Sequence, residues 1–239
     1  MPNLTLPRDL QSYPPFVNPP LAEQVKQALI GVGSQIGPTP AALEMARQAY
    51  FLADYLVKRF EEQNHLPEPI ACSPGCCYCC CNQVEVTPPE ALLISHYVHW
   101  QYAPQEKRHL QERLVRQLAW KAGKSKTELA RLRRKLPCPL LKKGRCTIYP
   151  VRPLVCRAMH AFSSQHCREA LRSGDQTEVP FYAHRHEIIL SISLGVRQAC
   201  RALQLPDKPA DLVAALYQHY TADGSQDRWL DDGEESPER

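Results

Sequence analysis

The chain has 239 residues, of which 44% are hydrophobic and 23% are charged, and its formal net charge is +4. This composition is typical of a globular protein with enough chain to bury a core. No run approaches the ~18 consecutive apolar residues of a membrane-spanning helix, so the sequence predicts no membrane partner. The first twenty residues lack the basic start and apolar run of a secretory signal, and a reducing cytoplasm is therefore the expected location.

Residues 1–38 are rich in proline at their start, and the sequence predicts an extended N-terminal arm there that contains one short helix. Apolar residues then recur at three- and four-residue spacing from Thr39 to just before Pro67. This period places them on one face of a helix, which predicts a long amphipathic helix over this stretch.

Two of the later helices begin with a capping box, in which a threonine or serine is followed three residues later by glutamate. These boxes start at Thr87 and Ser125, and Gly123 is expected to end the helix between them. Helices are predicted over residues 21–31, 39–66, 87–103, 104–122, 125–136, 179–203 and 209–221. Strand signals are confined to Val84–Val86 and Thr147–Tyr149.

The predicted fold is mainly α: a single irregular helical domain over residues 39–222, with little β structure and with cysteine-rich loops clamped by metal. The cysteine-rich region spans about residues 70–170. Residues 223–239 carry seven acidic and two basic side chains, which predicts an acidic, poorly ordered tail.

The eleven cysteines are the clearest functional signal in the sequence. Because their number is odd, complete intramolecular disulfide pairing is excluded. Six lie in CSPGCCYCCC, residues 72–81, and three more lie in CPLLKKGRCTIYPVRPLVCR, residues 138–157. Thiolates are soft ligands, and four of them suit zinc or an iron–sulfur cluster. We therefore expect the two segments to meet in space around bound metal, which would then contribute to the free energy of folding.

The spacing within the first segment favours metal ligation over simple packing. Pro74 and Gly75 predict a tight turn between Cys72 and Cys76. Cys76 and Cys79 have the C-x-x-C spacing that lets two sulfurs converge on one metal, and a redox dithiol is a weaker interpretation. Adjacent cysteines point in different directions, which leaves three alternatives: two metals, a cluster, or one cysteine of each pair that only packs.

Two motifs resemble those of a known family. The pattern C-x3-C-x2-C-C followed by VEVTPPEA, in residues 72–91, is similar to the first motif of the YkgJ-type cysteine cluster family, also described as the CxxCxxCC zinc- or iron-chelating domain. Residues 138–157 resemble its second motif, and Cys167 lies where members often have a further cysteine. The resemblance covers about residues 70–170 and implies binding of metal or an iron–sulfur cluster. Some members resemble the cluster-bearing part of a flagellin lysine methylase, which implies an alternative, an iron–sulfur-dependent enzyme acting on protein.

The predicted metal ligands are eight cysteines: Cys72, Cys76, Cys79, Cys80, Cys138, Cys146, Cys156 and Cys167. Cys77 and Cys81 are extra thiols within the first motif, and they leave the ligand set open. Cys200 lies on the apolar stripe of a late helix and is expected to pack in the core. An iron–sulfur cluster and zinc are close alternatives, with iron favoured because adjacent thiolates suit a multi-iron core.

The arginines of the second segment are the expected neighbours of the ligands. We expect Arg145, Arg152 and Arg157 to offset the negative charge of bound thiolates, because guanidinium groups donate hydrogen bonds to sulfur. Four histidines are weaker ligand candidates, for which a surface or capping role is expected instead: His160, His166, His184 and His186.

Residues 120–135 carry seven basic side chains and one acidic one. An exposed helix face is their expected role, so nucleic acid is not expected as a partner, and a zinc-stabilised nucleic-acid-binding module is kept as an alternative. The sequence has no phosphate loop, dinucleotide fingerprint or serine nucleophile motif, and no catalytic residue is assigned. A protein partner, if the chain has one, is not identified by any motif.

Overall fold

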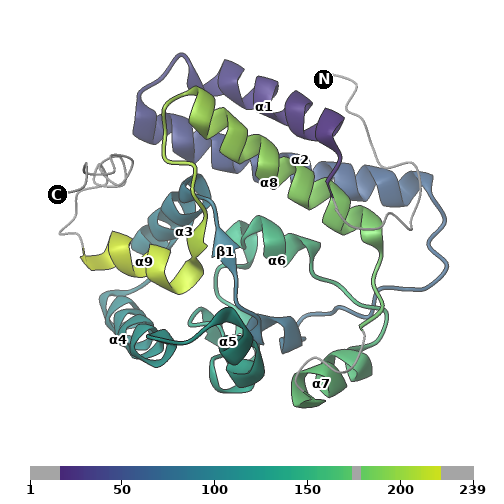
Figure 1. Cartoon of the computed structure of the whole chain (residues 1–239), viewed down its shortest axis with the longest axis vertical. Helices are drawn as coiled ribbons and strands as arrows, with labels where there is room; N and C mark the ends of the chain where they lie inside the picture. The colour runs from purple at the N-terminus through teal and green to yellow at the C-terminus, as the bar shows by residue number, and fades with distance from the viewer. Residues whose placement is uncertain (1–16, 174–178, 222–239) are drawn as a thin grey trace.

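The computed structural model describes residues 17–173 and 179–221, so the expected acidic tail and the start of the N-terminal arm lie outside the described residues. The described chain is mainly α-helical, as predicted (Figure 1). Its α-helices are α1 (Pro19–Gly33), α2 (Pro38–Gln63), α3 (Pro88–Gln101), α4 (Pro104–Lys121), α5 (Lys126–Leu132), α6 (Leu154–Ala158), α7 (Ser164–Ser173), α8 (Ala183–Ala202) and α9 (Leu212–Thr221). Single 3-10 turns form η1 (Tyr78–Cys81), η2 (Arg133–Lys135) and η3 (Tyr149–Val151). Two antiparallel pairs of strands complete this part of the chain: β1 (Glu85–Val86) with β4 (Ala210–Asp211), and β2 (Leu141–Lys142) with β3 (Arg145–Cys146).

Local sequence signals set most of the helix ends. Glu90 accepts a hydrogen bond from the Thr87 amide at 2.9 Å, which forms the predicted capping box at the start of α3. Gly123 has a φ of +71° directly after α4, where its missing side chain allows the left-handed turn that was predicted to end this helix. The helix expected from Thr39 begins one residue earlier, because Pro38 takes the first turn, with Gly37 as the N-cap.

Three expectations about local structure were wrong or incomplete. The helix expected over residues 125–136 ends at Leu132 and continues as the 3-10 turn η2. Residues 147–149 are not a strand, because the chain reverses earlier, through Lys143 and Gly144, and pairs β2 with β3 there. The short helices α6 and α7 were not predicted, since few turns give too little apolar periodicity to detect.

The helices enclose two hydrophobic cores that meet at α3. The first core joins α1, α2, α6 and α8, and the second joins α4, α9 and the loop residues Leu140 and Ile148. In Figure 1, α1, α2 and α8 lie together along the top, while α4, α5 and α7 lie at the opposite side. None of the described helices is long and apolar enough to cross a membrane.

The contact between α1 and α8 requires a residue without a side chain. A Cβ atom built on Gly195 of α8 would lie 2.8 Å from the Ala22 carbonyl oxygen and from Val25 Cβ of α1. Such a distance is closer than van der Waals contact allows, so glycine lets the two helices approach.

Candidate metal centre

The first cysteine segment, residues 72–81, folds into two consecutive tight turns. Gly75 has a φ of +95°, and the Cys76 amide donates to the Ser73 carbonyl at 3.0 Å. The next turn, η1, is closed by the Cys80 amide, which donates to the Cys77 carbonyl at 3.1 Å. The glycine makes the first turn accessible, because a φ in this range is costly for any residue with a side chain.

The structure brings the two cysteine segments into direct contact. The Cys138 amide donates a hydrogen bond to the Cys80 carbonyl at 2.7 Å. The turn between β2 and β3 also lies against the first segment, since a Cβ built on Gly144 would lie 3.6 Å from the Gly75 carbonyl oxygen. Backbone contacts alone therefore hold together two segments that are far apart in the sequence.

The chain that follows the second segment closes around the first one as well. The Ala71 amide donates to the Ala161 carbonyl at 2.9 Å, which ties the start of the first segment to the loop after α6. Cys156 lies in α6, and Cys167 lies in the first turn of α7, which packs against η1. All eleven cysteines are free thiols in this structure.

The thiols of the two segments and of α6 and α7 fall into two neighbouring groups. A group consists of thiols whose negative charges, once ionised, would raise one another's pKa. The first thiol group contains Cys79, Cys80, Cys138, Cys146 and Cys156. The second thiol group contains Cys72, Cys76, Cys79 and Cys167. Cys79 belongs to both groups, and together they contain the eight cysteines that the sequence predicts as ligands.

Most of these thiols hold their protons more tightly than a cysteine in water. Burial raises the pKa of Cys138 to about 11 and also raises that of Cys156. Cys79 is the exception, because a hydrogen bond from Cys80 and the nearby charge of Arg152 lower its pKa to about 7. Cys80, as the donor, has a raised pKa. Cys79 is therefore the thiol of the first group that ionises first.

The three predicted arginines play different parts. Arg152 stacks 4.0 Å from the centre of the Tyr149 ring, and its charge acts on Cys79 and also on Cys146, where it opposes the effect of burial. Arg145 is exposed on β3. Arg152 therefore has an electrostatic effect on two of the predicted ligands, and its role beside a bound metal stays a prediction.

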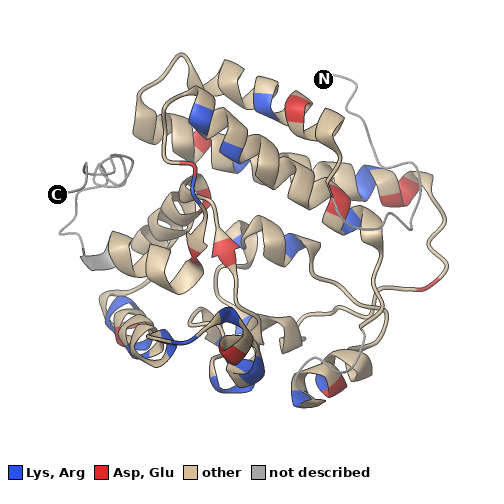
Figure 2. Cartoon of the chain, viewed as in Figure 1, with Lys and Arg blue, Asp and Glu red and all other residues tan. Residues whose placement is uncertain are grey.

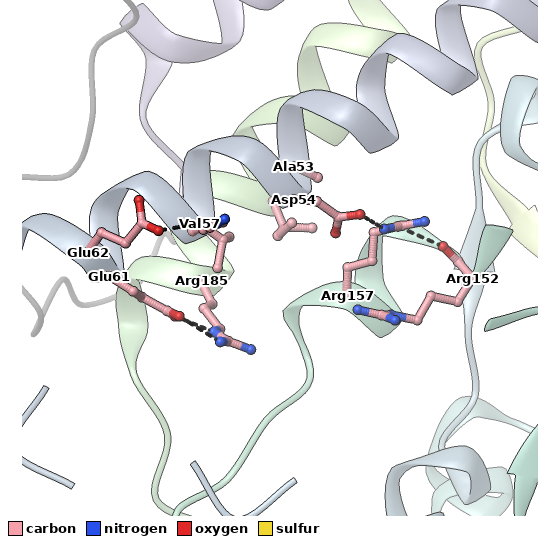
Figure 3. Close-up of a pocket in the computed structure, with 10 residues that line it drawn as sticks. Ala53, Asp54, Val57, Glu61, Glu62, Arg152, Arg157 and Arg185 are labelled. Atoms are coloured by element: carbon pink, nitrogen blue, oxygen red, sulfur yellow. Dashed lines mark hydrogen bonds and ion pairs between the residues drawn. The ribbon is translucent and has the colours of Figure 1, made fainter. Parts of the chain in front are cut away.

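Arg157 is a buried structural link. Its side chain is 4% exposed, donates to the Asp54 carboxylate, and donates to the Pro150 and Arg152 carbonyls at 2.7 and 3.1 Å (Figure 3). It also lies 4.3 Å from the centre of the Tyr50 ring. These contacts fix the loop that precedes α6, and so the position of the helix that carries Cys156.

A cavity of about 360 Å³ lies beside this arrangement. The guanidinium groups of Arg152 and Arg185 point into it from opposite sides in Figure 3, and Glu61 holds Arg185 through two hydrogen bonds of 2.5 and 2.8 Å. The charge of Arg185 also acts on Cys72. Sequence reasoning missed Arg185, because no cysteine lies near it in the sequence and its place beside Cys72 comes only from the packing of α8.

The histidines near the cysteines are occupied with structural contacts. His160 Nδ1 donates to the Ala158 carbonyl at 2.7 Å, and Nε2 accepts from the Tyr182 amide at 2.7 Å. His184 is buried and bonds Glu61 at 2.9 Å. The surface role expected for these two histidines is therefore replaced by buried hydrogen bonding.

The three remaining cysteines are not among the eight predicted ligands. Cys200 is fully buried in the first core, as expected for a packing residue. Cys81 is 8% exposed. Burial and the charge of Cys77 both raise the pKa of Cys81, whereas the charge of Arg133 lowers it. The sequence left Cys77 and Cys81 open as ligands, and in the structure the charges of Cys77 and Cys79 both act on Cys81.

The donor chemistry of the two thiol groups suits zinc or iron, since all eight donors are sulfur. Across the described ranges, no three His, Cys, Asp or Glu side chains are arranged so that they would hold a metal ion as they lie. The backbones of the two cysteine segments are nevertheless in contact. The residues present therefore suit zinc or an iron–sulfur cluster in their donor atoms and in the position of their backbones.

The comparisons with known proteins agree with the chemistry of the donors. No curated protein and no solved structure matches the chain significantly. A family model does match residues 71–179, and its description is CxxCxxCC, "Putative zinc- or iron-chelating domain". The matched range contains ten of the eleven cysteines and both thiol groups. Residues 71–179 of this chain are thus similar to the CxxCxxCC domain, which supports metal binding as their function.

Proposed function

We propose that the protein binds an iron–sulfur cluster or zinc through the thiolates of the first and second thiol groups. The observation that carries this proposal is the 2.7 Å hydrogen bond from the Cys138 amide to the Cys80 carbonyl. It joins the backbones of the two cysteine segments, which supports the convergence of their sulfurs on a shared site.

The order of proton loss follows from the environment of each thiol. Cys79, whose pKa is lowered to about 7, is the first thiolate that a cation meets, and it belongs to both groups. The other thiols would lose their protons on binding a metal, and Arg152 would offset part of the negative charge that accumulates there. A shared Cys79 suits two neighbouring ions or one multi-iron core, and iron is favoured slightly because Cys79 and Cys80 are adjacent.

The bound group supplies a cross-link between distant segments if it is zinc, and electron transfer as well if it is an iron–sulfur cluster. The free thiols of this chain require a reducing compartment, for which we propose the cytoplasm.

An iron–sulfur enzyme is a second candidate function, which one observation favours. The cavity of about 360 Å³ lies within reach of Arg152, whose charge acts on two thiols of the first group. A substrate in this cavity would contact Arg152, which connects the cavity to those thiols, whereas a purely structural zinc site needs no such opening.

The test is metal analysis of protein isolated without oxygen, together with its visible absorption spectrum. We expect bound metal in the native protein, and a large loss of metal in Cys80→Ser and in Cys138→Ser. The matched control is Cys200→Ala, which removes a buried thiol outside both groups and should retain the metal. Equal metal loss in all three variants would contradict the ligand assignment.

The spectrum distinguishes the two metals. A broad visible band that bleaches on reduction indicates an iron–sulfur cluster and keeps the enzyme candidate. A colourless protein that contains stoichiometric zinc removes that candidate and leaves the structural role.

A further inference from the structure

A second cavity, of about 270 Å³, lies between α4 and the segment that follows η2. Arg113, Arg116, Gln117 and Trp120 line it from α4, where their spacing places them on one face of the helix. Gln117 Nε2 donates to the Pro137 carbonyl at 2.5 Å, which fixes the helix against the opposite wall.

The cavity concentrates positive charge without a counterion. Arg113, Arg116 and Lys135 line it, no carboxylate does, and none of the three forms an ion pair with another described residue. Nearby lysines are neutralised instead, as Lys121 is by Asp211 at 2.7 Å. Figure 2 shows how densely basic residues gather on α4 and α5. Three converging cations with no acid attract an anion.

Arg113 gives this cavity an unmet hydrogen-bonding need. Its Nε atom is buried and has no hydrogen-bond partner among the described residues. A buried donor without an acceptor is costly, whereas an anion oxygen in the cavity would supply one. This requirement distinguishes the site from an ordinary solvated helix face.

Trp120 adds an aromatic wall beside the cations. Its side chain is 43% exposed although it lines the cavity, and Lys124 Nζ lies 5.7 Å over the centre of its ring, which adds a further cation beside the indole. Proteins bind single-stranded nucleic acid with cations that contact the phosphates and aromatic side chains on which the bases stack. The same two elements side by side suit a single nucleotide. The volume lies just below the range for small-ligand pockets, about 300–1,000 Å³, which limits the ligand to one small molecule such as a single nucleotide whose base extends over the exposed Trp120.

We infer that this cavity binds one mononucleotide, with its phosphate at Arg113, Arg116 and Lys135 and its base against Trp120. Cys138 also lines the cavity, so the nucleotide lies beside the first thiol group. The inference goes beyond metal binding and does not depend on it.

Isothermal titration of the isolated protein with AMP, adenosine and inorganic phosphate tests the inference. We expect AMP to bind at least tenfold more tightly than either fragment, because only AMP uses both halves of the cavity. Arg113→Gln and Lys135→Gln should each weaken AMP binding at least tenfold. The control, Arg131→Gln, removes an exposed charge of α5 outside the cavity and should change the affinity less than twofold.

Four results would overturn the inference. The first is no AMP binding by folded, metal-containing protein. The second is equal weakening by Arg131→Gln and Arg113→Gln, which would show a diffuse charge effect. The third is a single-stranded RNA decamer that binds more than tenfold tighter than AMP and is weakened by Arg131→Gln, which would show a polymer surface. Metal content is measured on every variant, and AMP binding that falls only where metal is lost would also contradict the inference.

Discussion

At the residue scale, Arg157 shows how one cation can organise a loop. Its three side-chain nitrogens all donate, to one carboxylate and two backbone carbonyls, while the guanidinium stacks on Tyr50. The spacing of the second motif indicated that Arg157 matters. It did not indicate why, because its partner Asp54 lies on α2, and only the tertiary fold brings the two together.

Replacing Arg157 by glutamine should lower the free energy of unfolding by about 1–3 kcal/mol, because the carbonyls of Pro150 and Arg152 lose charged donors and Asp54 loses its partner. Chemical denaturation measures the change. The matched control is Arg108→Gln, which removes an exposed arginine of α4 and should stay within about 0.5 kcal/mol. Equal midpoints for the two variants would contradict the buried role.

A second residue-scale prediction concerns pH. Burial lowers the pKa of His160 to about 4, below the value near 6.5 in the unfolded chain. Between these values the unfolded state binds more protons, so the stability that neutral His160 provides is present above about pH 6.5 and is lost as the pH falls towards 4.

This shift corresponds to about 3 kcal/mol over the window. Denaturation curves at several pH values should show that loss in the native protein and a smaller slope in His160→Asn. His186, whose pKa burial also lowers to about 4, accounts for the slope that remains in the variant. An unchanged slope in His160→Asn would show that His160 is not the titrating group.

At the element scale, the helices that the sequence predicted are those with local signals. The capping box at Thr87 marks the start of α3, and Gly123 marks the end of α4. Both signals act through residues next to each other in the sequence, so they can be recognised without the tertiary structure. The short α6 depends on contacts with α2 and α8, and α7 on contacts with η1, which a local pattern does not contain. The residues around the hairpin of β2 and β3, Leu140, Cys146 and Ile148, pack in or against the second core.

The approach of α1 to α8 gives an element-scale prediction. Gly195→Ala should destabilise the protein by about 1–3 kcal/mol, because the new methyl group would lie 2.8 Å from the Ala22 carbonyl. Gly31→Ala, on α1 with nothing within 4 Å of the added methyl group, should instead stabilise by about 0.5–1 kcal/mol. Thermal unfolding of both variants measures the difference, and equal shifts would contradict the close packing.

At the scale of the whole molecule, the first thiol group lies between the two hydrophobic cores. Cys138 and Cys146 pack against the second core, whereas Leu154 and Ala158, on either side of Cys156, belong to the first. The sequence predicted that the cysteine segments meet, from donor chemistry alone. The sequence could not predict that the segments meet at the junction of two hydrophobic cores. That junction exists because α3 contributes buried residues to both cores.

Metal at this junction should stabilise the whole described fold. Removing it with a chelator should lower the midpoint of thermal unfolding by about 2–4 °C for each kcal/mol of binding energy lost. The same chelator should leave the midpoint of Cys80→Ser nearly unchanged, since that variant already lacks the metal. An equal decrease in both proteins would show that the chelator acts elsewhere.

X-ray absorption at the edge of the native metal tests most directly whether the two cysteine segments bind that metal together. We predict a first coordination shell made of sulfur at about 2.3 Å, and a loss of sulfur neighbours or of the metal in both Cys76→Ser and Cys146→Ser. A shell of oxygen or nitrogen alone, or an unchanged sulfur shell in both variants, would contradict the account.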